Sequence, residues 1–209
     1  MTRAAASVVF LLLAVGCVSS TPYRRAPVPG RDAGDWGQLR DDASRRATLY
    51  DGFDHRGNAS ATWLSPEVRE AQVRRQAEWQ GKGAEETEQA VAQGRTEAAR
   101  GEEFVVAVYT ADRRANDLDA PRSIWHLELD DGETRVPASE VTVVNADATI
   151  RQLFVYVGPF DQVYRARFKW SGPPLAGRPF TLRISSSLGA LVLDFGPDGL
   201  RTRAPRLAP

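Results

Sequence analysis

The stretch Phe104-Val105-Val106-Ala107-Val108-Tyr109 carries an apolar or aromatic side chain at every position. Because successive side chains of a strand point to opposite faces of a sheet, such a run has both of its faces covered. We therefore expect a central strand at these residues. From Glu103 onward the apolar residues recur with a period of two, which is typical of a β-rich region.

Further strand-like segments follow at short intervals and are separated by turn residues. They lie at 124–129, 141–144, 153–157, 163–170, 180–184 and 188–195. About seven short strands between residues 102 and 200 predict a mainly β domain, namely an immunoglobulin-like β-sandwich. Trp125 is expected to be a large side chain of its core.

The segment 163–170 alternates cleanly between two kinds of side chain. One set is expected to face the core: Tyr164, Ala166, Phe168 and Trp170. The other set is expected to face outward: Arg165, Arg167 and Lys169. At a rise of ~3.3 Å per residue, these three cations are about 7 Å apart along one line and form a candidate binding stripe for an acidic ligand. The alternative is the solvated outer face of a half-buried strand.

A short hairpin and one or two helices are expected before the sandwich. Residues 47–50 and 59–64 are strand-like, with turn residues at 54–58 between them. Ser65 can cap a helix over 66–80, because Pro66 suits its first position. A second helix is expected over 84–100. Its only large apolar residue is Val91, so it should lie on the surface or in an interface.

The N-terminal residues have the order of a secretory signal. Arg3 precedes the apolar run 7–13, and small residues then lead to the only cysteine, Cys17. The sequence Leu13-Ala14-Val15-Gly16-Cys17 resembles the lipobox of bacterial lipoproteins. This resemblance, which covers only the first 20 or so residues, implies cleavage between Gly16 and Cys17, a lipid on the Cys17 thiol and a fatty acyl group such as palmitate on its amine.

The lipobox also implies a location in the bacterial cell envelope. Val18 follows the cysteine in place of the Asp that marks retention at the inner membrane, so an outer-membrane anchor facing the periplasm is expected. Five segments result from these interpretations. They are the signal peptide 1–16, the lipidated cysteine with a disordered tether 17–36, the hairpin plus helical extension 37–101, the β-sandwich domain 102–200 and the tail 201–209.

Composition and motifs give no indication of catalysis. Acidic and basic residues balance at 27 each, so no nucleic-acid partner is expected. His55 and His126 are the only histidines, and an acylated Cys17 leaves no thiol, so no metal site is predicted. No nucleophile elbow or cofactor motif is recognised, and we expect no enzyme and no cofactor.

The function expected from the sequence is binding or scaffolding in the envelope, with an envelope protein or an acidic polymer as partner. Two alternatives remain open. The chain could be a component of a larger envelope assembly that covers the helix 84–100. It could also be a glycan hydrolase, which would need two carboxylates about 5–10 Å apart across a cleft.

Overall fold

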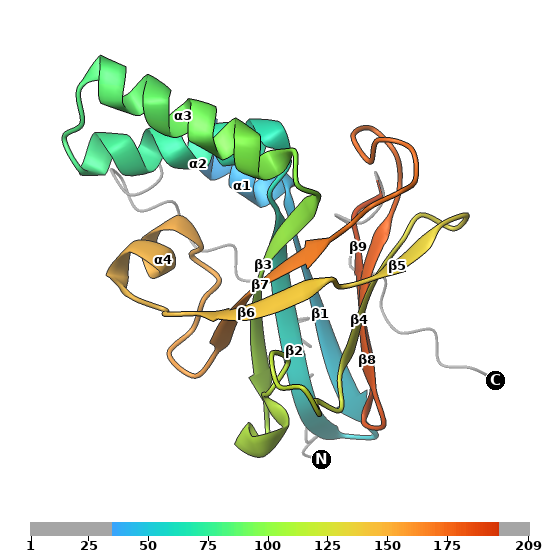
Figure 1. The fold of residues 1–209 in the computed structure, drawn as a ribbon. Helices are drawn as coiled ribbons and strands as arrows, with labels where there is room; N and C mark the ends of the chain where they lie inside the picture. Colours follow the sequence, from blue (N-terminus) through green and yellow to red (C-terminus); the bar gives the residue numbers. More distant parts are fainter. Residues whose placement is uncertain (1–34, 197–209) are drawn as a thin grey trace, which may run out of the picture. The chain divides into compact units, whose positions relative to one another are not determined.

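The computed structural model describes residues 35–196, and within them nine strands form two antiparallel sheets accompanied by four α-helices (Figure 1). The mainly β prediction is therefore confirmed. The strands are β1 (Ser44–Asp51), β2 (Asp54–Trp63), β3 (Glu102–Thr110), β4 (His126–Asp130), β5 (Arg135–Pro137), β6 (Glu140–Val144), β7 (Gln162–Phe168), β8 (Thr181–Ser186) and β9 (Gly189–Asp194). Gly16, Cys17 and the tail 201–209 lie outside the described residues.

The helices are α1 (Asp35–Asp42), α2 (Pro66–Trp79), α3 (Ala84–Ala98) and α4 (Ala148–Leu153), with a short 3-10 helix η1 at Arg113–Ala115. The predicted start of α2 is confirmed, because the Ser65 hydroxyl accepts a hydrogen bond from the Val68 backbone N–H at 3.3 Å. Helix α1 includes the last two residues assigned to the tether, and its Trp36 is buried. None of the helices within residues 35–196 has the length and apolarity that crossing a membrane requires.

Strand β3 occupies the centre of the five-stranded sheet, whose order is β1-β2-β3-β7-β6. The predicted central strand is therefore confirmed. The pairing of β2 with β3 runs from Gly57↔Thr110 to Trp63↔Phe104. The hairpin of β1 and β2 thus belongs to the same sheet as β3, and the segment boundary expected at residue 102 falls between two neighbouring strands.

The four-stranded sheet has the order β5-β4-β8-β9. Seven strands follow residue 102 in the described part of the chain, but they are not quite the predicted set. Strand β5 was not predicted. The prediction of a strand at 153–157 is wrong, because no strand forms there. Asp147 caps helix α4 by accepting a hydrogen bond from Ile150 N, and the following residues Phe154 and Val157 are buried without forming a strand.

Two buried clusters hold the elements together. The larger one contains side chains from both sheets, among them Phe104 of β3, Phe168 of β7 and Leu182 of β8. The second lies on the other face of β3, where Val105 and Ala107 pack with residues of α1, α2 and α4. Because strand side chains alternate, β3 contributes to both clusters, which explains its unbroken apolar sequence.

Trp125 lies in the larger cluster and its replacement by alanine should be costly. Its side chain is 5% exposed, and its indole N–H donates to the Ala115 carbonyl. Trp125→Ala should lower the free energy of unfolding by about 3–5 kcal/mol, as expected for removing a large buried aromatic ring. The matched control is Ile124→Ala at the neighbouring residue, which is 40% exposed. It should cost less than about 1 kcal/mol in the same urea titration. Equal losses for the two variants would contradict the burial of Trp125 in the larger cluster.

Candidate functional site

Glu103 of β3 is a carboxylate that is only 1% exposed and is surrounded by arginines. Its Oε2 lies 3.2 Å from Arg69 of α2, and its Oε1 lies 3.1 Å from Arg165 of β7. Arg167, also on β7, donates hydrogen bonds to Oε2 at 2.8 and 3.3 Å. The carboxylate therefore joins helix α2 to two neighbouring strands.

Two further glutamates extend this arrangement through Arg167. Its guanidinium lies 3.5 Å from Glu97 of α3 and 3.3 Å from Glu140 of β6. Three arginines and three glutamates from five elements thus form one charge-balanced group, which we call the Glu103 network: Arg69, Glu97, Glu103, Glu140, Arg165 and Arg167. It fixes the α2–α3 helical hairpin on the outer face of the five-stranded sheet.

The adjacent carboxylates Glu102 and Glu103 have pKa values that move in opposite directions. Burial would raise the pKa of Glu103, but the hydrogen bonds from Arg167 and the charge of Arg69 outweigh burial and lower it. Burial raises the pKa of Glu102, which accepts a single hydrogen bond of 2.7 Å from the Trp63 indole. The difference follows from strand alternation, since the two side chains leave β3 on opposite faces.

The predicted binding stripe lies partly within the Glu103 network. Tyr164, Ala166 and Phe168 are buried in the core, as their alternation predicted. Arg165 is paired with Glu103 and is 42% exposed, whereas Arg167 is 21% exposed and bound by three carboxylates. Lys169 follows the end of β7 and is exposed. Binding of an acidic ligand by the stripe stays a prediction.

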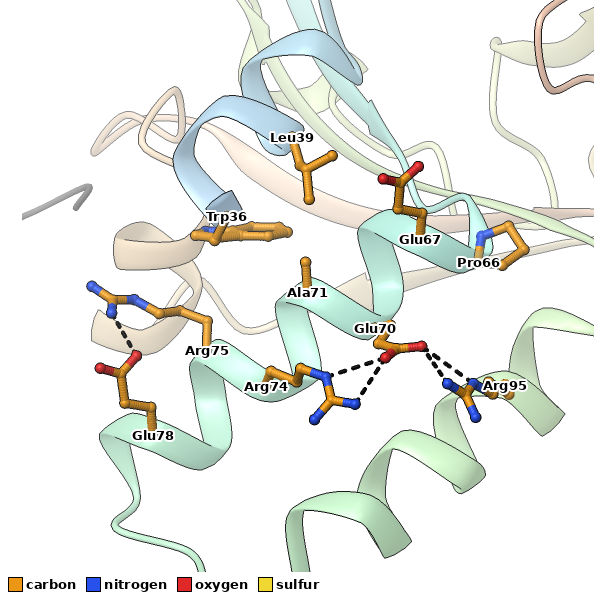
Figure 2. Close-up of a pocket in the computed structure, with 10 residues that line it drawn as sticks. All are labelled: Trp36, Leu39, Pro66, Glu67, Glu70, Ala71, Arg74, Arg75, Glu78 and Arg95. Carbon is orange, nitrogen blue, oxygen red and sulfur yellow. Dashed lines mark hydrogen bonds and ion pairs between the residues drawn. The ribbon is translucent and has the colours of Figure 1, made fainter. Parts of the chain in front are cut away.

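A groove lies where α1 meets the α2–α3 hairpin, and Figure 2 shows the side chains that line it. It has a volume of about 640 Å³. Its apolar lining comprises Trp36, Leu39, Pro66 and Ala71, and its charged rim comprises Glu67, Glu70, Arg74, Arg75, Glu78 and Arg95. We call this the helical groove. Trp36 reaches it because the ring is packed edge-on against Phe154, with the ring centroids 6.0 Å apart.

Ion pairs hold most of the charged rim in place. Glu70 of α2 accepts hydrogen bonds from Arg74 at 2.9 Å and from Arg95 of α3 at 2.7 Å, so it bridges the two helices (Figure 2). Arg75 donates to Glu78 at 2.6 Å, and its guanidinium lies 5.1 Å from the Trp79 ring. A groove whose walls are already ordered loses little conformational freedom when it binds a ligand.

The carboxylates of the helical groove are arranged for charge pairing. Hydrogen bonds from Arg95 and Arg74 lower the pKa of Glu70, so this carboxylate stays ionised, whereas a general acid for glycoside cleavage needs a raised pKa. Within residues 35–196, no group of three or more His, Cys, Asp or Glu side chains could hold a metal ion. His55 lies in the five-stranded sheet and stacks on Tyr109, whereas His126 begins β4 in the other sheet.

The groove and the Glu103 network were not predicted from the sequence. Helix α1 is short and mostly polar, so nothing in its pattern indicated that Trp36 is buried. One signal for Glu103 was present. Glu103 lies two positions before Val105 and four before Ala107, so alternation places it on the same covered face of the strand. The arginine partner on β7 is 64 positions away from Glu103, beyond the reach of any local pattern.

Comparison with known proteins gives no assignment to a family. The chain has no significant match among family models, curated proteins or solved structures.

Glu103→Gln should destabilise the domain by about 3–5 kcal/mol, because it leaves buried Arg69 without its carboxylate. Glu140→Gln is the matched control. It removes a partner of Arg167 that is more than half exposed, and it should cost about 0–1 kcal/mol. Both changes are measured by urea unfolding. Similar small losses would mean that the Glu103 network is not coupled to folding.

The stabilisation by Glu103 should also depend on pH in a defined direction. A carboxylate whose pKa is lowered by folding stabilises the folded state fully above its unfolded pKa of about 4.3, and this contribution is lost as the pH falls through the folded pKa. The stability difference between the wild type and Glu103→Gln should therefore be constant from pH 7 to about pH 5 and shrink at lower pH. A difference that grows in acid would contradict the assignment.

Proposed function

We propose that this protein is a lipid-anchored cell-envelope protein whose folded domain binds a partner without catalysis, and that the helical groove is the binding surface. The observation that carries the proposal is an apolar groove of about 640 Å³ whose charged rim is held by ion pairs. Preformed concave sites with apolar walls and a few placed polar groups are typical of binding sites. The lipobox-like sequence at Cys17 supports anchoring at the envelope, with the outer membrane as the expected location.

The position of the groove in the chain agrees with a role near a membrane. Trp36 follows Cys17 by 19 positions, and even a fully extended chain spans at most about 3.6 Å per residue, or about 70 Å. A lipid on Cys17 would therefore keep the groove within this distance of the membrane surface. The partner is then expected to be another envelope component.

The chemistry of the groove favours an amphipathic protein segment over an acidic polymer. Its rim has three carboxylates, Glu67, Glu70 and Glu78, beside three arginines, so it offers no excess positive charge. Its apolar lining matches a partner that presents an apolar face, such as a helix laid into the groove. Affinity would then come mainly from apolar burial, with the rim setting orientation.

We also propose that the two sheets form a β-sandwich of immunoglobulin-like kind. Support comes from the larger buried cluster, which takes side chains from both sheets and includes Trp125. Immunoglobulin-like sandwiches likewise have one core between two antiparallel sheets.

A second candidate is a component of a larger envelope assembly, and helix α3 favours it. Val91 is the only buried residue of this helix, and much of its remaining surface is exposed. A partner that covered this surface would contact Ala92 and its neighbours. The two candidates place the partner on different helices and can therefore be distinguished.

A matched pair of substitutions separates the two candidates. Ala71→Arg places a long charged side chain into the helical groove, whereas Ala92→Arg places the same side chain on the exposed face of α3. Partners cross-linked in intact envelopes and recovered with the protein should be lost in Ala71→Arg and retained in Ala92→Arg. The reverse result supports the assembly. Retention of the same partners in both variants would contradict both candidates.

The lipid anchor is tested separately. Cells that express the wild type should incorporate a tagged fatty acid into the protein, and Cys17→Ser should abolish this labelling because it removes the modified thiol. Mass spectrometry of the mature wild-type protein should find Cys17 at its N-terminus. Equal labelling of both forms, or an N-terminus elsewhere, would overturn the lipoprotein assignment.

A further inference from the structure

A second hollow lies near the end of β9 and differs in chemistry from the helical groove. It has a volume of about 470 Å³ and receives residues from α1, the start of α2, the segment before β8 and the residues after β9. Trp63, Phe180 and Phe195 form an aromatic wall. The Phe180 and Phe195 rings stack with centroids 4.9 Å apart, and Trp63 meets Phe180 edge-on at 5.1 Å. We call this hollow the mouth pocket.

The mouth pocket is lined by two acids, Asp42 and Glu67, and by two arginines, Arg45 and Arg178. Its two cations are already engaged. Arg45 lies over the Phe195 ring and donates to the Asp194 carbonyl at 2.8 Å, and Arg178 lies 3.8 Å from Asp131. The carboxylates around it are Asp42, Glu67, Asp131 and Asp194, and the first two line the pocket itself. Both arginines already have acidic neighbours, whereas Glu67 has no ion pair within residues 35–196, so the pocket favours an occupant that brings apolar surface and a positive charge to Glu67.

The chain supplies a segment of this chemistry at the pocket itself. Gly196 is the last described residue, is buried and lines the mouth pocket. The residues after it read Pro197-Asp198-Gly199-Leu200-Arg201-Thr202-Arg203-Ala204-Pro205-Arg206-Leu207-Ala208-Pro209. Three arginines exceed one aspartate in this segment, so it can supply a positive charge opposite Glu67. Leu200 is four positions from Gly196 and so lies within about 14 Å of it.

We propose that residues 197–209 bind within the same chain to the mouth pocket, with Leu200 on the aromatic wall and an arginine at Glu67. Glu67 makes no ion pair with another residue of the described part of the chain, so its carboxylate is available for this contact. Attachment at Gly196 makes binding intramolecular, and the high effective concentration that results allows weak contacts to suffice. Because salt screens exposed ion pairs, the contact of an arginine with Glu67 should weaken as salt rises.

The test uses the full mature chain with Cys17→Ser, which leaves no other cysteine. Thr202→Cys is then labelled with a small fluorophore that an indole ring quenches on contact. We expect quenching in this protein, loss of quenching in Trp63→Phe and retention in Trp79→Phe, because Trp79 lies at the end of α2 outside the mouth pocket. Glu67→Gln and high salt should each reduce quenching.

The outcomes decide the proposal even if Trp63→Phe fails to fold. Glu67 is exposed, so Glu67→Gln should melt like the parent protein and serves as the second variant. Quenching that is unaffected by Glu67→Gln and by salt would overturn the proposal, as would its absence from the parent protein. Quenching that increases with protein concentration would instead place the segment of a second copy in the pocket, which also overturns binding within one chain.

Discussion

The buried carboxylate of Glu103 is the constraint on which the rest of the structure depends. It lies on β3 and pairs with Arg69 of α2 and with Arg165 and Arg167 of β7. Arg167 also pairs with Glu97 of α3 and Glu140 of β6. Desolvation of so many charges offsets much of their attraction, so the network is better understood as fixing position than as adding stability. Arginine suits this role because its planar guanidinium presents several donors in a fixed geometry.

The helical groove follows from this fixed position. Helix α2 is set on the sheet by Arg69, and α3 is set against α2 by the contact of Arg95 with Glu70. Helix α1 then packs beside α2 through Trp36, which leaves a space between their side chains. Because α3 buries so little apolar surface, charge pairs determine its position to an unusual degree. The helical groove therefore depends on the ion pairs that position α2 and α3.

The sequence was sufficient to predict most of the strands, because their apolar residues alternate. It also predicted the start of α2, where Ser65 and Pro66 act locally. It failed at 153–157, since Phe154 and Val157 are buried by tertiary packing that no short-range pattern reveals. The candidate site was not predictable for a related reason. Trp36 and Ala71 meet in the groove, and Glu103 meets its arginines, only after segments distant in sequence have come together. The alternation of side chains predicted that Arg165 and Arg167 share a face of β7. It did not predict that Glu103 pairs with them on that face.

The hydrogen bond from Arg45 to the Asp194 carbonyl has a consequence for how the domain is assembled. It joins residues 149 positions apart and places β1 beside β9, which are the first and last strands within residues 35–196. The larger core therefore cannot close until nearly the whole domain has been synthesised, and the contact brings a large entropic cost of chain closure. Until then Leu49 of β1, which lies against Gly189 of β9 and packs on the larger cluster, lacks part of its cover, and the exposed apolar surface of an incomplete chain is prone to association with other chains. A newly made chain should consequently depend on protection from aggregation for as long as β9 is missing.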